Sequence, residues 1–427
     1  MSVHFAEQHP APASPAHPAG QLVAAGLGLQ GQVPGILLGA KGHRIAAVAA
    51  GDYHSLAVTD DGALITAGLD DDEQVSGIFA AASGKAVFSV AAGGFHSLAV
   101  THDGRLLAAG KDQNKQVSDI LAAARGTPVA AVACAAVHSL AAARDGRILA
   151  AGWDGDGQVT GILDAARDVK VRAVAAGDFH SLAVTADGRL LAAGRDDDRQ
   201  VSGILDAARG KRVVAVSAAA LQSLAVTDEG ELLAAGRDGN HQVSGILRAA
   251  QGLRIAAVAA GHLHSLAVTR DGRLLAVGKD SDKQVSGILA ETKDKQVTAV
   301  AAGGYHSLAV LAPDGPRGRT VRVAFVAAHG PEQGVTLQFL EPEDGLDVRL
   351  YAGRPARDFA VREGVALRTA VRRDADGGEE VLGTGSVHFT YDELTGVAGL
   401  DTRASRFPSH LTCTSHGGNR FTFTWNR

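Results

Sequence analysis

The chain has 427 residues, of which 41 are lysine or arginine and 46 are aspartate or glutamate, so its formal net charge is -5. Charges of both signs are interspersed and provide no basic field of the kind that nucleic acid requires, so we expect no nucleic-acid partner. The two cysteines, Cys134 and Cys413, are too few and too far apart for a disulfide framework, and nothing requires an oxidising compartment.

We expect a soluble, cytoplasmic protein with no membrane partner. Gly, Asp or Lys interrupts every apolar stretch before it reaches the roughly 18 residues of a membrane-spanning helix. Residues 1–20 lack the basic segment and apolar core of a signal peptide. They contain Pro10, Pro12, Pro15 and Pro18 among alanine and polar residues, and we predict that they form a disordered tail.

A repeat of 42 residues organises the chain that follows. A histidine, replaced once by glutamine, precedes a serine in every copy, at His54, His96, His138, His180, Gln222, His264 and His306. A glutamine followed by valine recurs with the same step, at Gln32, Gln74, Gln116, Gln158, Gln200, Gln242 and Gln284. Such self-similarity indicates a repeat architecture in which each unit buries its faces against its neighbours.

Each copy of the repeat predicts four short strands. In one copy we expect them at residues 86–92, 96–101, 105–109 and 116–118. The second strand alternates His, Leu and Val with smaller Ser, Ala and Thr, so that both of its faces suit burial. An Asp-Gly pair follows it and is a strong hairpin signal, because glycine accepts positive φ. The Gly-Ile-Leu segment after each Gln-Val is compatible with a helical turn but is too short for an independent helix.

The two ends of the array indicate a ring. Residues 22–33 contain only the third and fourth strands of a copy, and residues 297–310 contain only the first and second. Six complete copies and two complementary halves make seven units, whereas an open solenoid would need polar capping repeats. We predict an all-β, seven-bladed propeller over residues 21–315, closed by the N-terminal strands so that few strand edges are exposed.

Beyond this array the period stops, and residues 316–427 are predicted to form a second domain. Five segments alternate in the manner of strands, at residues 321–326, 335–340, 348–351, 381–389 and 421–425. We expect a C-terminal β-rich domain, a sandwich or a small barrel.

The repeat resembles a known family. The pattern Gly-x-x-His-Ser-Leu-Ala-Val-Thr-x-Asp-Gly-x-Leu-x-Ala-x-Gly, followed by Gln, is similar to the repeat of the regulator of chromosome condensation superfamily. The chain also resembles compact bacterial propellers of that superfamily that inhibit β-lactamases. The resemblance implies a propeller that binds proteins. The superfamily includes exchange factors for small GTPases, but the low basic charge of this chain argues against that role.

The six motif histidines are expected to be structural, because ligands of one zinc must all reach it at about 2 Å while neighbouring sheets lie roughly 10 Å apart. The loops before six of the seven recurring glutamines offer pairs of oxygen ligands two residues apart, as in Asp70 and Asp72, whereas residues 27–31 contain no carboxylate. Calcium is one interpretation of these loops. The other is turn formation, since Asp and Asn bond their own backbone. We expect no other cofactor and no other metal.

The positions that vary within the repeat indicate where a partner binds, because binding residues tend to lie on loops carried by a rigid scaffold. Aromatic residues of the kind that anchor interfaces occupy four of seven equivalent positions, and ionisable residues stand beside them. The predicted partner-binding residues are Asp52, Tyr53, Phe95, Trp153, Asp178, Phe179, Arg195, Arg237, His262 and Tyr305. A second ring of candidate positions directly follows the glycine at the end of the third strand. Lys111 and Lys279 occupy it, together with Trp153, Arg195 and Arg237. The alternative is that the aromatics fill the channel or pack between blades.

Two functional hypotheses follow. The first is a non-enzymatic module whose loop rim holds a protein partner, as an interaction scaffold, regulator or inhibitor. The second is an enzyme or small-ligand-binding protein that acts through the channel or the C-terminal domain. We predict no catalytic residue, because Cys134 is expected to be a buried hydrophobe and the spacing of His410, Cys413 and His416 in a strand separates neighbours onto opposite faces.

Overall fold

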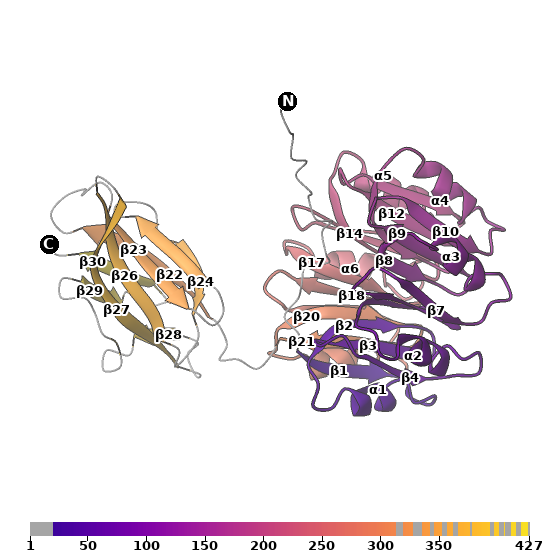
Figure 1. Ribbon diagram of the computed structural model, residues 1–427, viewed down its shortest axis with the longest axis horizontal. Coiled ribbons are helices and arrows are strands. Elements are labelled where there is room, and N and C mark those ends of the chain that lie inside the picture. Colours follow the sequence, from indigo (N-terminus) through magenta and orange to yellow (C-terminus); the bar gives the residue numbers. More distant parts are fainter. Residues whose placement is uncertain are drawn as a thin grey trace. The chain divides into compact units, whose positions relative to one another are not determined.

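The computed structural model describes residues 20–312 and, beyond them, residues 319–327, 335–341, 346–351, 357–361, 366–375, 378–392, 397–400, 405, 411–415 and 420–425. The chain divides into two compact units, Met1–Pro313 and Asp314–Arg427, and each is considered by itself (Figure 1). The predicted tail lies outside the described residues, apart from Gly20.

Within residues 20–312 the strands form seven antiparallel sheets of three strands each, which we call blades. The first six blades, in chain order, are β2 (Ile45–Ala50), β3 (His54–Thr59) and β4 (Leu64–Gly68); β5 (Val87–Ala92), β6 (His96–Thr101) and β7 (Leu106–Gly110); β8 (Val129–Cys134), β9 (His138–Ala143) and β10 (Ile148–Gly152); β11 (Val171–Ala176), β12 (His180–Thr185) and β13 (Leu190–Gly194); β14 (Val213–Ala219), β15 (Gln222–Thr227) and β16 (Leu232–Gly236); β17 (Ile255–Ala260), β18 (His264–Thr269) and β19 (Leu274–Gly278). The predicted predominance of β structure and the seven repeated units are confirmed.

The seventh blade combines the two ends of the array. It joins β20 (Val297–Ala302) and β21 (His306–Leu311) to β1 (Gln21–Gly26), which pairs antiparallel with β21 from Gln21 opposite Leu311 to Gly26 opposite His306. The first strand of each blade contacts the first strand of the next, and β20 contacts β2 in the same way. Figure 1 shows β20 and β21 lying beside β2 and β3.

The fourth strand predicted for each copy is wrong, because a short helix follows the recurring glutamine and valine. The helices are α1 (Pro34–Gly39), α2 (Ser76–Ala82), α3 (Ser118–Ala123), α4 (Thr160–Ala165), α5 (Ser202–Ala208), α6 (Ser244–Ala249) and α7 (Ser286–Glu291). Asp112 Oδ1 accepts hydrogen bonds of 2.9 Å from the backbone N–H groups of Val117 and Ser118. This satisfies donors that the start of a helix leaves without partners.

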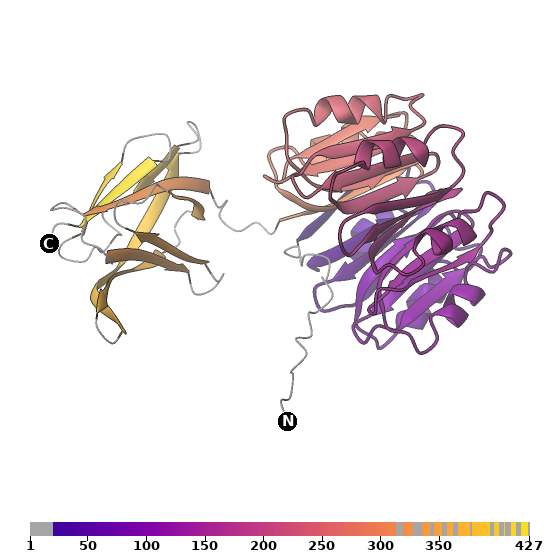
Figure 2. The same cartoon turned by 90° about the horizontal axis from the view of Figure 1, so that it is seen from above.

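These helices are too short to be stable alone and depend on packing. Each one packs against the third strand of the next blade, as α2 does against β7. A Cβ at Gly77 would lie 3.1 Å from the Ala109 methyl carbon, so glycine allows the close approach. The helix thereby covers the edge strand of a three-stranded sheet, which would otherwise invite pairing with another chain. Figure 2 shows helices along the outer side of the blades.

The middle strand of every blade is buried from end to end, and the side chains on one of its faces are larger than those on the other. In β3, Leu56 and Val58 belong to one core cluster with Ala99 of the next blade. Ala57, on the opposite face, belongs to another cluster with Leu308 of the preceding blade. Large side chains of one blade therefore meet small ones of its neighbour, as the predicted alternation requires.

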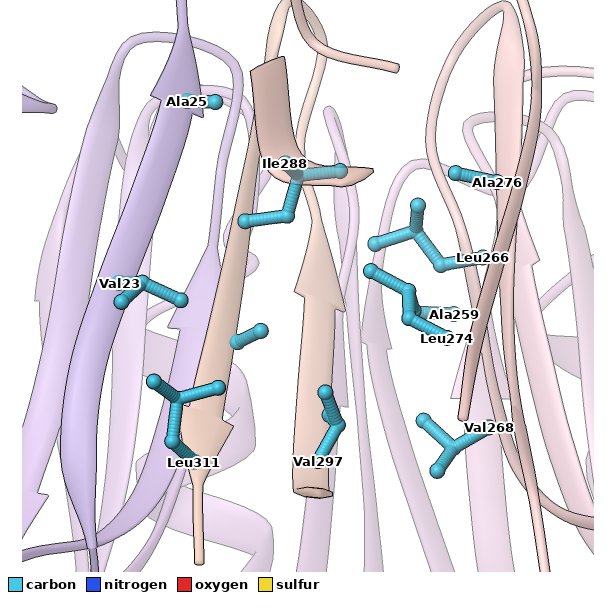
Figure 3. Packing of buried hydrophobic residues seen from close by; sticks show 11 residues of the cluster. Val23, Ala25, Ala259, Leu266, Val268, Leu274, Ala276, Ile288, Val297 and Leu311 are labelled. Atoms are coloured by element: carbon cyan, nitrogen blue, oxygen red, sulfur yellow. The ribbon is translucent and has the colours of Figure 1, made fainter. Parts of the chain in front are cut away.

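Each helix also contributes to the apolar core between blades. In Figure 3, Ile288 of α7 lies between Val23 of β1 and Leu266 of β18, in the cluster shared by the sixth and seventh blades. Ile288 and Leu266 are fully buried. The first strand of the chain is thus part of the same continuous core as the later blades.

A hydrogen bond between neighbouring blades repeats around the unit. The motif histidine places its Nε2 at 2.7–2.9 Å from the Oγ atom of a serine in the next blade. The pairs are His54 with Ser97, His96 with Ser139, His138 with Ser181, His180 with Ser223, His264 with Ser307 and His306 with Ser55. Gln222 replaces the histidine once, and its Nε2 donates to the carbonyls of Gly261 and His264.

The direction of these hydrogen bonds defines the state of the histidine ring. Ser97 Oγ donates to the carbonyl of Gln74 at 2.8 Å, which uses its single proton. His54 Nε2 must therefore donate to Ser97 Oγ, so the ring is the neutral tautomer that carries its proton on Nε2. Ser223 and Ser307 also donate to glutamine carbonyls, which assigns the same tautomer to their histidine partners.

The second unit consists of two sheets in the described residues. One has the order β25 (Arg357–Val361), β22 (Arg319–Ala327), β30 (Arg420–Trp425) and β29 (Leu411–Ser415), and the other has the order β24 (Leu346–Tyr351), β23 (Val335–Glu341), β26 (Ala366–Ala375), β27 (Gly378–Asp392) and β28 (Val397–Leu400). Leu337, Leu350 and Phe423 are buried. The five predicted strands are confirmed, whereas β25, β26, β28 and β29 were not predicted.

Acid is expected to destabilise the first unit through its motif histidines. Burial lowers the pKa of all six to about 3 or 4, from an ordinary value of 6.5. Between pH 6.5 and about 4 the unfolded chain binds more protons than the folded chain, so the free energy of unfolding falls as the pH falls. Each histidine contributes a slope of up to about 1.4 kcal/mol per pH unit. Urea unfolding at a series of pH values measures this slope.

A His138→Gln variant is the matched control, because Gln222 occupies the equivalent position naturally. The variant should reduce the slope by roughly one sixth, since one of six titrating groups is removed. Trp153 fluorescence in a Trp425→Phe background confines the signal to the first unit. A free energy of unfolding that stays constant from pH 6.5 to pH 5 would contradict the assignment.

Candidate functional site

Seven equivalent loops join the first and second strands of the blades, and they carry most of the predicted partner-binding residues. The carbonyl of the residue before each motif position accepts a hydrogen bond from the residue that follows the third-strand glycine. The pairs are Tyr53 with Leu69, Phe95 with Lys111, Val137 with Trp153, Phe179 with Arg195, Leu221 with Arg237, Leu263 with Lys279 and Tyr305 with Leu27. The two rings of candidate residues are therefore adjacent within every blade, and we call this surface the rim.

The third-strand glycine makes this adjacency possible. Gly110 has a φ of 113°, in the region that other residues rarely adopt. A Cβ there would lie 2.5 Å from the carbonyl oxygen of Phe95. The repeated glycine thus brings the chain against the loop of its own blade and sets Lys111 beside Phe95.

Three ionisable residues from non-adjacent blades meet at the rim. Asp52, Asp178 and His262 come from the first, fourth and sixth blades and occupy the same position of the repeat. His262 Nε2 lies 2.9 Å from Asp52 Oδ1 and 3.9 Å from Asp178 Oδ1. Residues of such distant blades can approach so closely only near the axis around which the blades are arranged. We call these three residues the axial triad.

Small residues at the same repeat position in the other blades leave room for the axial triad. They are Gly94, Ala136, Ala220 and Gly304. A Cβ at Gly304 would lie 3.3 Å from Asp52 Oδ1 and 3.4 Å from His262 Nδ1. A larger residue there would press on the ion pair.

The axial triad combines one imidazole with two carboxyl groups. Burial lowers the pKa of His262. The hydrogen bond and charge of Asp52 and the charge of Asp178 outweigh this effect and raise the pKa from its ordinary value of 6.5 to about 9. His262 is therefore an imidazolium at neutral pH. Burial raises the pKa of Asp178, the charge of Asp52 adds to this effect, and the charge of His262 opposes it. Both carboxyl groups thus face the His262 ring, Asp52 at the shorter distance.

Two tyrosines lie against the axial triad. The rings of Tyr53 and Tyr305 stack with their centroids 5.5 Å apart and their planes inclined by 26°. The rings of His262 and Tyr305 meet in a T-shaped arrangement with their centroids 6.3 Å apart. The Lys279 ammonium lies 5.8 Å from the centroid of the Tyr305 ring. Residues of the first, sixth and seventh blades thus form one connected surface.

Other candidate residues form two smaller groups on the rim. Trp153, which is 37% exposed, meets Phe179 edge to face at 5.8 Å, and the Arg195 guanidinium lies 5.4 Å from the Phe179 centroid. Lys111 lies 5.0 Å from the centroid of Phe95. Arg237 is exposed, but its blade offers a leucine instead of an aromatic ring beside it, so it stands apart from the groups.

Sequence reasoning proposed Asp52, Asp178 and His262 individually but missed that they form an ion-paired cluster. The available signal was that three ionisable residues share one repeat position while the other copies hold glycine or alanine. Sequence reasoning also missed that a cation lies over each of the Phe95, Phe179 and Tyr305 rings. The 42-residue step places Lys111 and Arg195 at equivalent positions, but it does not reveal that these positions lie over Phe95 and Phe179.

The aspartates of the acidic loops accept hydrogen bonds from backbone N–H groups of the repeat. Asp70 Oδ1 accepts hydrogen bonds from Val75 and Ser76, and Gln74 Oε1 accepts one from the backbone of Asp72. This is the turn chemistry that was one of the two interpretations. Across the part of the chain that the structure describes, no group of three or more His, Cys, Asp or Glu residues could hold a metal ion.

The remaining candidates offer little chemistry. Cys134 is buried, as predicted, and burial raises the pKa of its thiol. Burial also raises the pKa of Cys413, to about 12. His410 and His416 lie outside the described residues. Among the residues described, none of the helices is long and apolar enough to cross a membrane.

The protonation of His262 provides a test of the axial triad. Asp52→Asn removes the nearer carboxylate, so the pKa of His262 should fall from about 9 by at least about one unit. A pH titration of the imidazole carbon signals by NMR measures this value. Asp145→Asn, in a hairpin turn of the third blade, is the control and should leave the pKa unchanged. An unaltered His262 pKa in Asp52→Asn would contradict the ion pair.

Four segments of the sequence match the regulator of chromosome condensation (RCC1) repeat, at residues 45–74, 89–116, 171–200 and 255–284. No curated protein matches the chain in sequence. Among solved structures, human WBSCR16 is 19% identical, with a TM-score of 0.57, and the match covers 69% of this chain and 100% of that one.

Prp20p from Saccharomyces cerevisiae is 17% identical, with a TM-score of 0.57, over 70% of this chain and 92% of its own. Yeast RCC1 (Prp20) in complex with Kap60 is 16% identical, also with a TM-score of 0.57, over 74% and 97%. At these identities the structures support a shared fold and no more. The sequence matches thus identify regulator of chromosome condensation repeats in four segments of this chain, and its repeated three-stranded blades resemble the propeller fold of these structures.

Proposed function

We propose that this protein is a non-enzymatic binding scaffold whose rim holds a protein partner. The carrying observation is the concentration of aromatic and cationic side chains on one surface. Only 4% of the residues in the chain are aromatic, yet Tyr53, Phe95, Trp153, Phe179 and Tyr305 all lie on the rim. Such residues dominate the energetics of protein interfaces, because they bury a large area with few rotatable bonds.

Related propellers provide a precedent for protein partners. The Prp20p structure is described together with the binding of that protein to Gsp1p and histones, and yeast RCC1 has been solved with Kap60 bound. Binding of a protein by this chain would use the same fold. Inhibition of a target enzyme is one form that such binding could take.

The scaffold we propose is a closed ring with a second interaction unit. The pairing of β1 with β21 and the hydrogen bond between His306 and Ser55 support closure of the ring by the N-terminal strand. The sheets of four and five strands in residues 319–425 support a sandwich-like domain that would bind or assemble separately. A rigid ring would hold the rim residues in place before the partner arrives, which reduces the entropic cost of binding.

Affinity capture from native cytoplasmic extract, followed by mass spectrometry, tests the proposal. Two double variants divide the rim: Tyr53→Ala with Tyr305→Ala, and Trp153→Ala with Phe179→Ala. Truncating an anchoring aromatic costs at least about 2 kcal/mol of binding free energy, which is roughly thirtyfold in affinity. We expect at least one double variant to lose the partner.

Phe79→Ala is the matched control, because Phe79 is an exposed aromatic residue on α2 and lies away from the rim loops. It should capture the partner as the wild type does. All variants should retain the thermal unfolding temperature of the wild type, which shows that the scaffold is intact. Identical captures by the wild type and both folded double variants would refute the rim as the binding surface.

A further inference from the structure

Among the described residues, His262 is the only ion-pair partner of the two carboxyl groups of the axial triad. Its two carboxylates, Asp52 and Asp178, share one imidazolium, and the short hydrogen bond of that imidazolium goes to Asp52. Asp178 Oδ1 is 3.9 Å from His262 Nε2, which is too long for a hydrogen bond. The side chain of Asp178 is 20% exposed, so an incoming group can reach it.

Three cations of the rim lie over aromatic rings and do not form ion pairs with the triad. Lys111 lies over Phe95, Arg195 lies over Phe179 and is paired with Asp197 at 2.7 Å, and Lys279 lies over Tyr305. In residues 20–312 the acidic members of the triad have no ion pair with a lysine or arginine within 4.0 Å. Asp178 therefore has no lysine or arginine of this part of the chain as an ion-pair partner.

The surroundings of the axial triad suit a planar cation. The stacked rings of Tyr53 and Tyr305 lie beside His262 of the triad, and aromatic faces attract cations, as Lys279 over the Tyr305 ring shows. A guanidinium binds a carboxylate through two parallel hydrogen bonds and stacks on aromatic rings, whereas an ammonium acts as a compact point charge. Lysine and arginine side chains are the cations that a protein partner can present on a protruding loop.

We propose that the axial triad, together with Tyr53 and Tyr305, is a subsite for an arginine side chain of the bound partner. The inference rests on the proposed function, because it specifies what the partner presents at the centre of the rim. The aromatic groups around the axis then contact the apolar surface next to that arginine. Asp178 is the residue that pairs with the guanidinium, and Asp52 holds His262 in place.

Small probes test the subsite without the partner. N-acetyl-arginine methylamide should produce saturable NMR shifts at the rings of Tyr53, Tyr305 and His262, with a dissociation constant in the millimolar range. The citrulline analogue has the same shape without the charge and should bind at least about tenfold more weakly. The lysine analogue should bind more weakly than the arginine probe, and equal binding would reduce the assignment to any cation. Equal binding of the citrulline analogue would overturn the proposal.

Variants locate the interaction. Asp178→Asn should weaken the arginine probe at least about tenfold, and Tyr305→Leu should weaken it several-fold through loss of the ring face. Asp197→Asn, an exposed carboxylate paired with Arg195, is the control and should bind the probe as the wild type does. Unchanged probe affinity in a folded Asp178→Asn variant would overturn the subsite.

The probe experiment and the capture experiment fail independently. If the rim double variants lose a partner but the probe does not bind, the proposed function stands and the arginine subsite is wrong. If the probe binds but no partner is captured, the axial triad binds a guanidinium, but its assignment to an arginine of a protein partner is wrong. A captured partner whose binding is unaffected by Asp178→Asn would also refute the arginine contact.

Discussion

The hydrogen bond from a buried histidine to a serine of the next blade is the constraint on which the propeller depends. It crosses the interface between blades where the Leu and Val face of one middle strand meets the Ser and Ala face of the next. The histidine ring is fully buried and must remain neutral, because an imidazolium in that position would lose its hydration. The serine in turn donates to the carbonyl of a recurring glutamine, as Ser97 does to Gln74, so one small network joins two blades and a loop. Gln222 joins the same interface in a different way, because its Nε2 donates to two backbone carbonyls and its Oε1 accepts a hydrogen bond from Ser265 Oγ.

This repeated frame explains why variation is concentrated on the rim. The motif histidine and the glycine at the end of the third strand hold the backbone of each loop, and the residues just before the histidine are free to differ between copies. Because seven equivalent positions converge on one axis, three substitutions are enough to create a cluster that no single blade contains. Asp52, Asp178 and His262 are that cluster, and the glycine and alanine residues of the other copies make it possible. The arrangement of the blades thus brings into contact residues that are 84 or more positions apart in sequence.

Much of the fold could be predicted from the sequence, because the 42-residue period and the Asp-Gly hairpins are local and repeated signals. The short helices could not be predicted, since α3 depends on the Asp112 cap and on packing against the next blade. For the site, the repeat positions of Tyr53, Phe179 and Tyr305 were accessible from sequence. The stacking of Tyr53 on Tyr305 and the ion pair of Asp52 with His262 were not, because they depend on which blades face each other across the axis. In the second unit, alternation revealed five strands, while β26 with its several arginines did not show a clear apolar face.

A single long-range proton–nitrogen NMR spectrum of the histidine rings tests the inter-blade network most directly. At pH 7, the account predicts that His54, His96, His138, His180, His264 and His306 are all neutral and carry their proton on Nε2. Their signals should stay unchanged as the pH is lowered to about 5, because burial lowers the pKa of each ring to about 3 or 4. Rings protonated on Nδ1, or signals that titrate near the ordinary histidine value of about 6.5, would contradict it.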